Sequence, residues 1–164
     1  FMNDSLIVRP ITISEIGFLD KMLYNAIFVP PGNERLPDNI IEHPEISKYI
    51  KDFGREGDIC FVAQLNGDLV GAIWTRHFNE SNKAYGFVDS DTPELSMAVY
   101  EQFRNKGIGT RLLSTMIKAL TDKGYRQVSL SVDIINYAYD LYKKIGFKDY
   151  KLIGESMTMI LKLK

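Results

Sequence analysis

Residues 94–132 form the segment that most restricts the folds open to this 164-residue chain. A β-rich run, ELSMAV at 94–99, leads through a glycine-containing turn into an amphipathic stretch, and QVSLSV follows at 127–132. The stretch between the two runs spaces its apolar residues three and four apart, which predicts a helix that begins after Gly107 and stops at Gly124. A strand, a helix and a strand in this order form a right-handed crossover between two parallel strands. The sequence therefore predicts an α/β protein.

The rest of the chain supplies antiparallel strands and further helices around this unit. Asn66-Gly67 separates two β-rich runs and is the turn signal of a hairpin. The other predicted elements are a strand at 6–9 stopped by Pro10, a helix capped by Ser14 and running to Ile27, a helix from Asp38 or Pro44 to about Phe53, hairpin strands at 58–65 and 69–76, a polar loop at 79–91, a helix opened by Asn136 and closed by Gly146, and terminal strands at 147–153 and 157–163. Together they predict one α/β domain over residues 2–164, with a mixed central sheet of about seven strands and about four helices.

Composition excludes several classes of function. Lys and Arg number 20 against 21 Asp and Glu, a net charge of −1, so nucleic-acid binding through a basic excess is not expected. No apolar run approaches the roughly 20 residues of a membrane-spanning helix. Metal binding is not expected either, because Cys60, His43 and His77 lie far apart without ligand spacing.

The N-terminus and the cysteine content suggest where the protein works. No charged segment leads into an apolar stretch at the start, so we expect no secretory signal. Phe1 is expected to be an added residue ahead of a natural start at Met2. Cys60 is the single cysteine and permits no internal disulfide, which fits a cytoplasmic protein in which Cys60 is a small core residue.

The turn before the central helix has the character of a phosphate site. Unpaired N–H groups at a helix N-terminus attract anions, and glycines at 107 and 109 leave the backbone bare. Arg104 and Lys106 add positive charge, so a diphosphate is expected to bind from Asn105 to Thr110. A P-loop does not fit, because its lysine follows the glycines. A dinucleotide fingerprint does not fit, because Leu112 stands where the third glycine belongs.

Two motifs in order resemble the GCN5-related N-acetyltransferase (GNAT) family. The first is Arg-x-x-Gly-x-Gly at 104–109, directly after a strand, and the second is NYAYDLYKKIGF at 136–147. The resemblance is specific over about residues 94–147. It implies a single-domain acyl-CoA N-acyltransferase fold and transfer of an acetyl group from acetyl-CoA, as cosubstrate, to a primary amine.

The resemblance also implies which residues bind the cosubstrate. The backbone of the β-rich run 94–99 would pair with the pantetheine arm as an added strand pairs with a sheet edge. The strands at 94–99 and 127–132 would splay apart, which would expose these backbone groups. The implied cosubstrate-binding residues are Met97, Ala98, Val99, Arg104, Asn105, Lys106, Gly107, Ile108, Gly109, Thr110, Asn136 and Tyr142. Asn136 serves equally as a helix cap.

Two residues are candidates for proton transfer. A lysine-type amine is protonated at neutral pH and needs a base, and Glu94, at the start of its strand, is the first candidate. A solvated strand-end carboxylate is the competing interpretation, and Asp89 and Asp91 are weaker candidates. Tyr142 occupies the position of the family's acid and would supply a donor to the departing thiolate, although a buried tyrosine can also simply pack.

The acceptor remains open between a small amine, an amino acid derivative and a peptide end. Acidic residues around Arg35 in the 28–45 loop favour a cationic amine or are merely solvated. A second hypothesis is a non-catalytic acyl-CoA-binding sensor or regulatory module, and a third is a nucleotide-binding domain. No membrane partner is expected, and both a monomer and a homodimer are compatible with the sequence.

Overall fold

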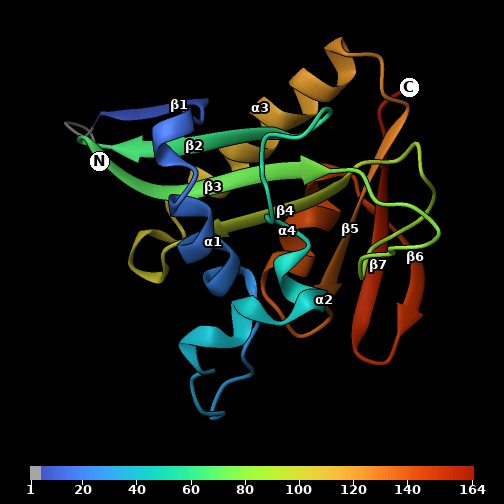
Figure 1. The fold of residues 1–164 in the computed structure, drawn as a ribbon, viewed down its shortest axis with the longest axis horizontal. Coiled ribbons are helices and arrows are strands. Elements are labelled where there is room, and N and C mark those ends of the chain that lie inside the picture. Colours follow the sequence, from blue (N-terminus) through green and yellow to red (C-terminus); the bar gives the residue numbers. More distant parts are fainter. Residues whose placement is uncertain (1–4) are drawn as a thin grey trace.

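The computed structural model describes residues 5–164, so the expectation about Phe1 and Met2 lies outside the described residues. Seven strands form one mixed sheet in the order β1-β2-β3-β4-β5-β7-β6, and β4 with β5 is the one parallel pair among the described strands. The strands are β1 (Leu6–Pro10), β2 (Ile59–Leu65), β3 (Asp68–Arg76), β4 (Glu94–Val99), β5 (Gln127–Asp133), β6 (Lys148–Ile153) and β7 (Ser156–Lys162). The helices are α1 (Phe18–Ala26), α2 (Pro44–Ser47), α3 (Ile108–Asp122) and α4 (Ala138–Ile145). The predicted α/β fold with seven strands and four α-helices is confirmed (Figure 1).

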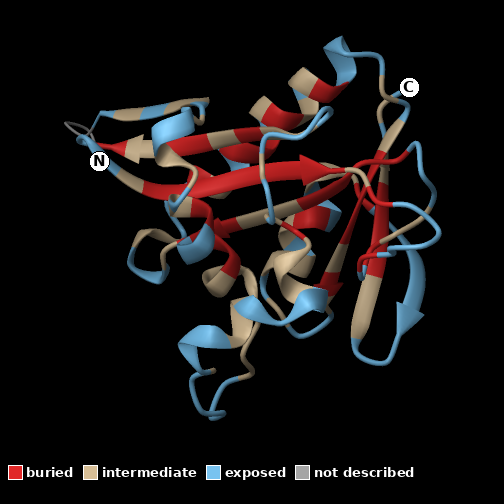
Figure 2. Cartoon of the chain, in the orientation of Figure 1, coloured by how far each residue is buried: buried red, intermediate tan, exposed pale blue. Residues whose placement is uncertain are grey.

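The helices cover both faces of the sheet and create two cores. α3 turns five buried apolar residues toward one face, where α4 and the C-terminal strands join the larger core. α1 and the segment around α2 cover the other face, where Trp74 and Tyr49 are buried. Figure 2 shows the buried residues concentrated on the central strands, whereas β6 is exposed along its length. Within residues 5–164 no helix is long and apolar enough to cross a bilayer.

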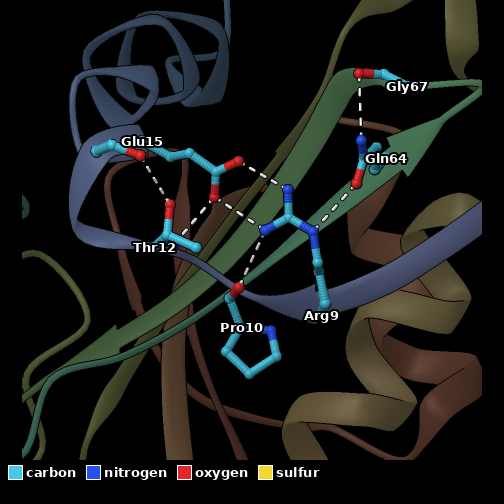
Figure 3. Close-up of polar contacts among 7 residues, drawn as sticks. Arg9, Pro10, Thr12, Glu15, Gln64 and Gly67 are labelled. Atoms are coloured by element: carbon cyan, nitrogen blue, oxygen red, sulfur yellow. Dashed lines mark hydrogen bonds and ion pairs between the residues drawn. The ribbon is translucent and has the colours of Figure 1, made fainter.

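The first helix begins differently from the prediction. A 3₁₀ turn at Ile13–Glu15 precedes α1, and its cap is Thr12 rather than Ser14. Thr12 and Glu15 form a capping box, and Arg9 on β1 donates to both carboxylate oxygens of Glu15 at 2.9 and 2.7 Å (Figure 3). Arg9 also donates to Gln64 on β2 at 3.0 Å, so one guanidinium joins β1, β2 and the start of α1.

The second predicted helix is not continuous. Residues Asp38–Glu42 form a 3₁₀ turn, and α2 spans only Pro44–Ser47. Pro44 is the cause, because the residue before a proline is kept out of the helical region and His43 is extended, at φ −62° and ψ 130°. Irregular turns then run to Phe53, past Asp52 with its positive φ of 54°.

The parallel strands β4 and β5 separate almost at once. They are in register at one pair, Glu94 with Ser129, where Ser129 N–H donates to Pro93 O at 3.0 Å. Beyond this pair the strands diverge, and Figure 1 shows β2–β4 and β5–β7 running in clearly different directions. The predicted splay between 94–99 and 127–132 is therefore present.

Candidate active site

The N-terminus of α3 presents unpaired backbone donors. Gly107 is the N-cap, no side chain caps the helix, and the first bond closing the helix runs from Arg111 N–H to Gly107 O at 3.1 Å. The N–H groups of residues 108–110 therefore precede any intrahelical acceptor. Gly107 and Thr110 are exposed here, so the donors lie at the surface with the positive end of the helix dipole.

The two signature glycines do different things. Gly107 has φ +83°, a left-handed conformation that favours glycine, and a Cβ built there would meet nothing within 4 Å. At Gly109 a Cβ would lie 3.5 Å from Met97 Cε and 3.6 Å from Leu141 Cδ2. Gly107 thus permits the turn and leaves open space beside it, whereas Gly109 lies against side chains of β4 and α4.

The edge of β4 that β5 leaves unpaired is the second feature of the site. Tyr100 N–H donates to Val70 O on β3 at 2.9 Å, and backbone groups alternate in direction along a strand. By this alternation Met97 and Val99 turn their peptide groups to the β5 side, whereas those of Ala98 turn to β3. Arg104 Nε donates to Val99 O at 3.0 Å, and its guanidinium lies 5.5 Å from the Tyr137 ring centre. Of the three residues predicted to offer backbone groups, Met97 and Val99 have the required direction.

Glu94 begins β4 and is 3% exposed, so it is not the solvated strand-end carboxylate that competed with the prediction of a base. Its Oε2 accepts hydrogen bonds from Tyr49 Oη at 2.7 Å and from Gly86 N–H at 3.1 Å. Its Oε1 and Thr75 Oγ1 are the two buried side-chain polar atoms of the described chain without a hydrogen-bond partner. Buried polar atoms are normally paired, so Oε1 has a vacant acceptor position.

The environment of Glu94 raises the pKa of its carboxyl above the ordinary value for glutamate. Burial raises the pKa of Glu94 to about 7, against the hydrogen bonds from Tyr49 and Gly86 and the charge of Lys48, which lower it. A carboxyl with such a pKa is suited to accept and release a proton near pH 7. Asp89 and Asp91, the weaker candidates, lie in the loop before β4, where Asp89 Oδ1 accepts from Thr92 and from Asp91 N–H.

Tyr142 lies on α4, on the opposite side of the sheet from Tyr49 and Glu94. It belongs to the core formed with α3, whereas Tyr49 belongs to the core formed with α1. Tyr142 is 6% exposed, its ring packs on Phe147 at 5.6 Å between centres, and burial raises its pKa above the usual 10. Its hydroxyl therefore stays protonated at physiological pH.

Asn136 and Cys60 have local structural roles. Asn136 Oδ1 accepts from Ala138 N–H at 3.0 Å, but α4 begins at Ala138 with Tyr137 as its N-cap, so Asn136 lies one residue before the predicted capping position. Cys60 is buried in the core beneath α1, and burial raises the pKa of its thiol to about 12, which removes it from nucleophilic chemistry.

Two residues at the site were missed from sequence. Tyr49 fell within the helix predicted to run to about Phe53, but no pattern indicated that its hydroxyl meets a carboxylate 45 positions away. Gly86 lies in the 79–91 segment, which was expected to be only a polar loop. The signal available there was a lone glycine beside aromatic residues, which does not specify a contact.

Comparison with known proteins agrees with this geometry. The sequence pattern of the acetyltransferase (GNAT) family matches residues 23–147. An N-alpha-acetyltransferase of Sulfolobus acidocaldarius is 36% identical over 155 residues, covering 89% of this chain and 82% of that protein. Another N-alpha-acetyltransferase, from Sulfurisphaera tokodaii, is 39% identical over 97 residues, covering 57% of this chain and 58% of its own length. The crystal structure of the PaiA N-acetyltransferase of Thermoplasma acidophilum with coenzyme A superposes with a TM-score of 0.69 at 20% identity, covering 96% of this chain and 99% of that one, which shows a shared fold.

Proposed function

Because this chain belongs to the acetyltransferase (GNAT) family and is an acetyl-CoA-dependent N-acetyltransferase, we propose that its acceptor is the α-amino group of a polypeptide N-terminus. The observation that carries the proposal is the buried Glu94, whose Oε1 has no partner at the point where β4 leaves β5. The names of the two N-alpha-acetyltransferases support the choice of acceptor.

The cosubstrate is proposed to bind across the N-terminus of α3 and the free edge of β4. The diphosphate would accept hydrogen bonds from backbone donors between Asn105 and Thr110, with Arg104 and Lys106 adding positive charge. The amide-bearing arm would pair with peptide groups of Met97 and Val99, with Asn136 nearby on the β5–α4 connection. Arg104 would give up its hydrogen bond to Val99 O and contact the cosubstrate instead.

Glu94 is proposed as the general base. The nitrogen of the acceptor amine must lose one proton as it bonds to the thioester carbonyl carbon, and Oε1, the carboxylate oxygen without a hydrogen-bond partner, would take it directly or through a water. An α-ammonium has an unperturbed pKa of about 8, so transfer to a carboxylate of pKa about 7 is uphill by about 1.4 kcal/mol. For a lysine side chain of pKa about 10.4 the same transfer costs about 4–5 kcal/mol. The lower free-energy cost of proton transfer to Glu94 favours an α-amine as the acceptor over a lysine side chain.

Tyr142 is proposed as the donor to the leaving group. When the carbon–sulfur bond breaks, the sulfur leaves with the electron pair as a thiolate. A tyrosine hydroxyl kept neutral by burial donates a hydrogen bond to that sulfur and stabilises its charge. Acid and base then act from opposite faces of the sheet, with the gap between β4 and β5 joining them.

The experiment is a thiol-release assay with acetyl-CoA and two matched peptide sets. One set has free N-termini and no lysine, and the other has blocked N-termini and one internal lysine. We expect turnover with the first set and at least 10-fold lower kcat/KM with the second. Turnover confined to the lysine peptides, or to small amines added to the panel, would overturn the proposed acceptor. Mass spectrometry of the product locates the acetyl group.

A further inference from the structure

Tyr49 contacts the buried carboxylate from outside the motifs that identify the family. Its hydroxyl lies 2.7 Å from Glu94 Oε2 and accepts the backbone N–H of Tyr85 at 2.9 Å. A tyrosine hydroxyl has one proton to donate, and here its oxygen already accepts a hydrogen bond from the N–H of Tyr85. The proton of Tyr49 is therefore directed to Glu94.

The segment that carries Tyr49 is fixed by two side chains of β3. Trp74 Nε1 donates to Tyr49 O at 3.1 Å, and Arg76 donates to Lys48 O at 3.0 Å and to Lys51 O at 2.7 Å. Arg76 is 1% exposed and is neutralised by Asp58 through bonds of 3.1 and 2.7 Å. Because buried charges that are fully paired hold a defined geometry, Tyr49 is anchored although it follows a helix of only four residues.

The second hydrogen bond to Glu94 depends on Gly86. A Cβ at Gly86 would lie 2.7 Å from Leu130 C and 2.8 Å from Ser131 N, so no larger residue fits against β5 here. Ser129 Oγ donates to Gly86 O at 2.8 Å and holds the loop on β5. This close approach brings Gly86 N–H to Glu94 Oε2.

We propose that Tyr49 is a positioning residue whose hydroxyl, together with the Gly86 N–H, holds Oε2 of Glu94 so that Oε1 is the oxygen that accepts the amine proton. The inference rests on the proposed role of Glu94 as the base. It explains why one carboxylate oxygen has two donors and the other has none.

The other charged groups facing Glu94 do not replace this contact. Arg76, its register partner on β3, is engaged by Asp58, and Lys48 bonds to Glu45 and to Lys83 O. From β5 the facing residue is the neutral Ser129. Tyr49 is thus the side chain in direct hydrogen-bond contact with Glu94 among the described residues, and its loss is expected to raise the pKa of Glu94.

The test uses the variant Tyr49→Phe, and the matched control is Tyr150→Phe at an exposed position of β6. Carbon-13 NMR of glutamate carboxyls, with Glu94 identified by its loss in Glu94→Gln, reports the titration of Glu94 without turnover. In parallel, kcat/KM is measured against pH. In Tyr49→Phe we expect both midpoints to move up by about one pH unit, with about 10-fold lower kcat/KM at pH 6 and an unchanged KM for acetyl-CoA. Tyr150→Phe should match the parent protein.

The outcomes separate this inference from the proposed function. An unmoved Glu94 titration in Tyr49→Phe would overturn the positioning role and leave the base assignment standing. A titration that moves while the rate profile stays in place would overturn Glu94 as the base, and with it the catalytic meaning of the contact. Should Tyr49→Phe not fold, 3-fluorotyrosine at position 49 keeps the shape and donates more strongly. It should move both midpoints down, and an absent or upward shift would contradict the proposal.

Discussion

Glu94 lowers the stability of the fold at the pH where it is most useful. A buried carboxylate with one unpaired oxygen is poorly solvated, and the contacts to Oε2 together with the charge of Lys48 offset part of this cost. Burial accordingly raises its pKa to about 7. A residue that served stability alone would be better replaced by an uncharged one, so retention of the carboxylate fits a role in proton transfer.

The pH dependence of stability tests whether the buried Glu94 carboxyl has a raised pKa and costs stability when it ionises. A carboxyl whose folded pKa is raised above its unfolded value stabilises the fold below pH 4.5, and this contribution is lost as the pH rises through about 7. Glu94→Gln does not ionise, so relative to the parent protein it should gain about 3 kcal/mol in free energy of unfolding between pH 4 and pH 8. Urea denaturation at both pH values measures this gain. The exposed Glu34→Gln is the control and should show no such gain.

Tyr142 should affect turnover rather than binding. Tyr142→Phe keeps the buried ring and its contact with Phe147 but removes the donor, so we expect kcat to fall about 100-fold while the Kd for acetyl-CoA changes less than about threefold. Tyr139→Phe on the same helix loses a hydroxyl that bonds Asp149 and should retain activity. Stopped-flow turnover and calorimetry give the two quantities. Unchanged kcat in Tyr142→Phe would refute the assignment of the acid.

Among the elements, α3 has a structural role and a proposed binding role. Its buried face fills the larger core, and at its N-terminus the N–H groups of residues 108–110 have no intrahelical acceptor. Both ends are flanked by glycines with positive φ, Gly107 at +83° and Gly124 at +89°. A substitution at either glycine would strain the backbone, but only one at Gly107 would also disturb the proposed diphosphate site.

Alanine substitution at each end of α3 distinguishes an effect on stability from an effect on coenzyme A binding. Gly107→Ala and Gly124→Ala should each cost about 1–2 kcal/mol in free energy of unfolding, because a Cβ is strained at positive φ. Only Gly107→Ala should also weaken coenzyme A, by about 10-fold in Kd, since it disturbs the turn that presents the donors. Denaturation and isothermal titration calorimetry measure the two effects. Equal loss of affinity in both variants would show that the turn at Gly107 does not bind the diphosphate.

At the scale of the whole molecule, the sheet separates the residues proposed to bind the cosubstrate from the proposed base. The cosubstrate elements, α3 and α4, share one core, and Tyr49 and Glu94 lie with α1 on the other face. The divergence of β4 and β5 is the connection between them. In the proposed mechanism, a thioester bound between these strands would meet an amine that arrives from the opposite face.

Coenzyme A should therefore stabilise the molecule by completing the sheet at this gap. At about 100 times its Kd the free energy of unfolding should rise by about 2.7 kcal/mol, and Tm by about 5–10 °C. Hydrogen exchange should slow at Met97, Val99 and residues 108–110, whereas the exposed strand β6 serves as the internal control. Protection that spared β4 and the start of α3 would show that the ligand binds elsewhere.

The sequence by itself determined the order of elements and the cosubstrate signature. Periodicity and turn residues predicted the crossover of β4, α3 and β5 and the Asn66-Gly67 hairpin, because both are specified by residues close together in the chain. It misplaced the cap of the first helix, and of the two starts predicted for the second helix Pro44 is confirmed, whereas the helix ends at Ser47 and not near Phe53.

Only the tertiary structure decided what surrounds Glu94. Its partners Tyr49 and Gly86 come from the turns after α2 and from the loop before β4, and they are held by contacts of Trp74 and Arg76 with the segment after α2 and by the packing of Gly86 on β5. A carboxyl's burial and its hydrogen bonds depend on residues distant in the chain, so its pKa cannot be inferred from its own position in the sequence. The local pattern thus predicted where a cosubstrate would bind, and long-range packing left Oε1 of Glu94 as the carboxylate oxygen without a hydrogen-bond partner.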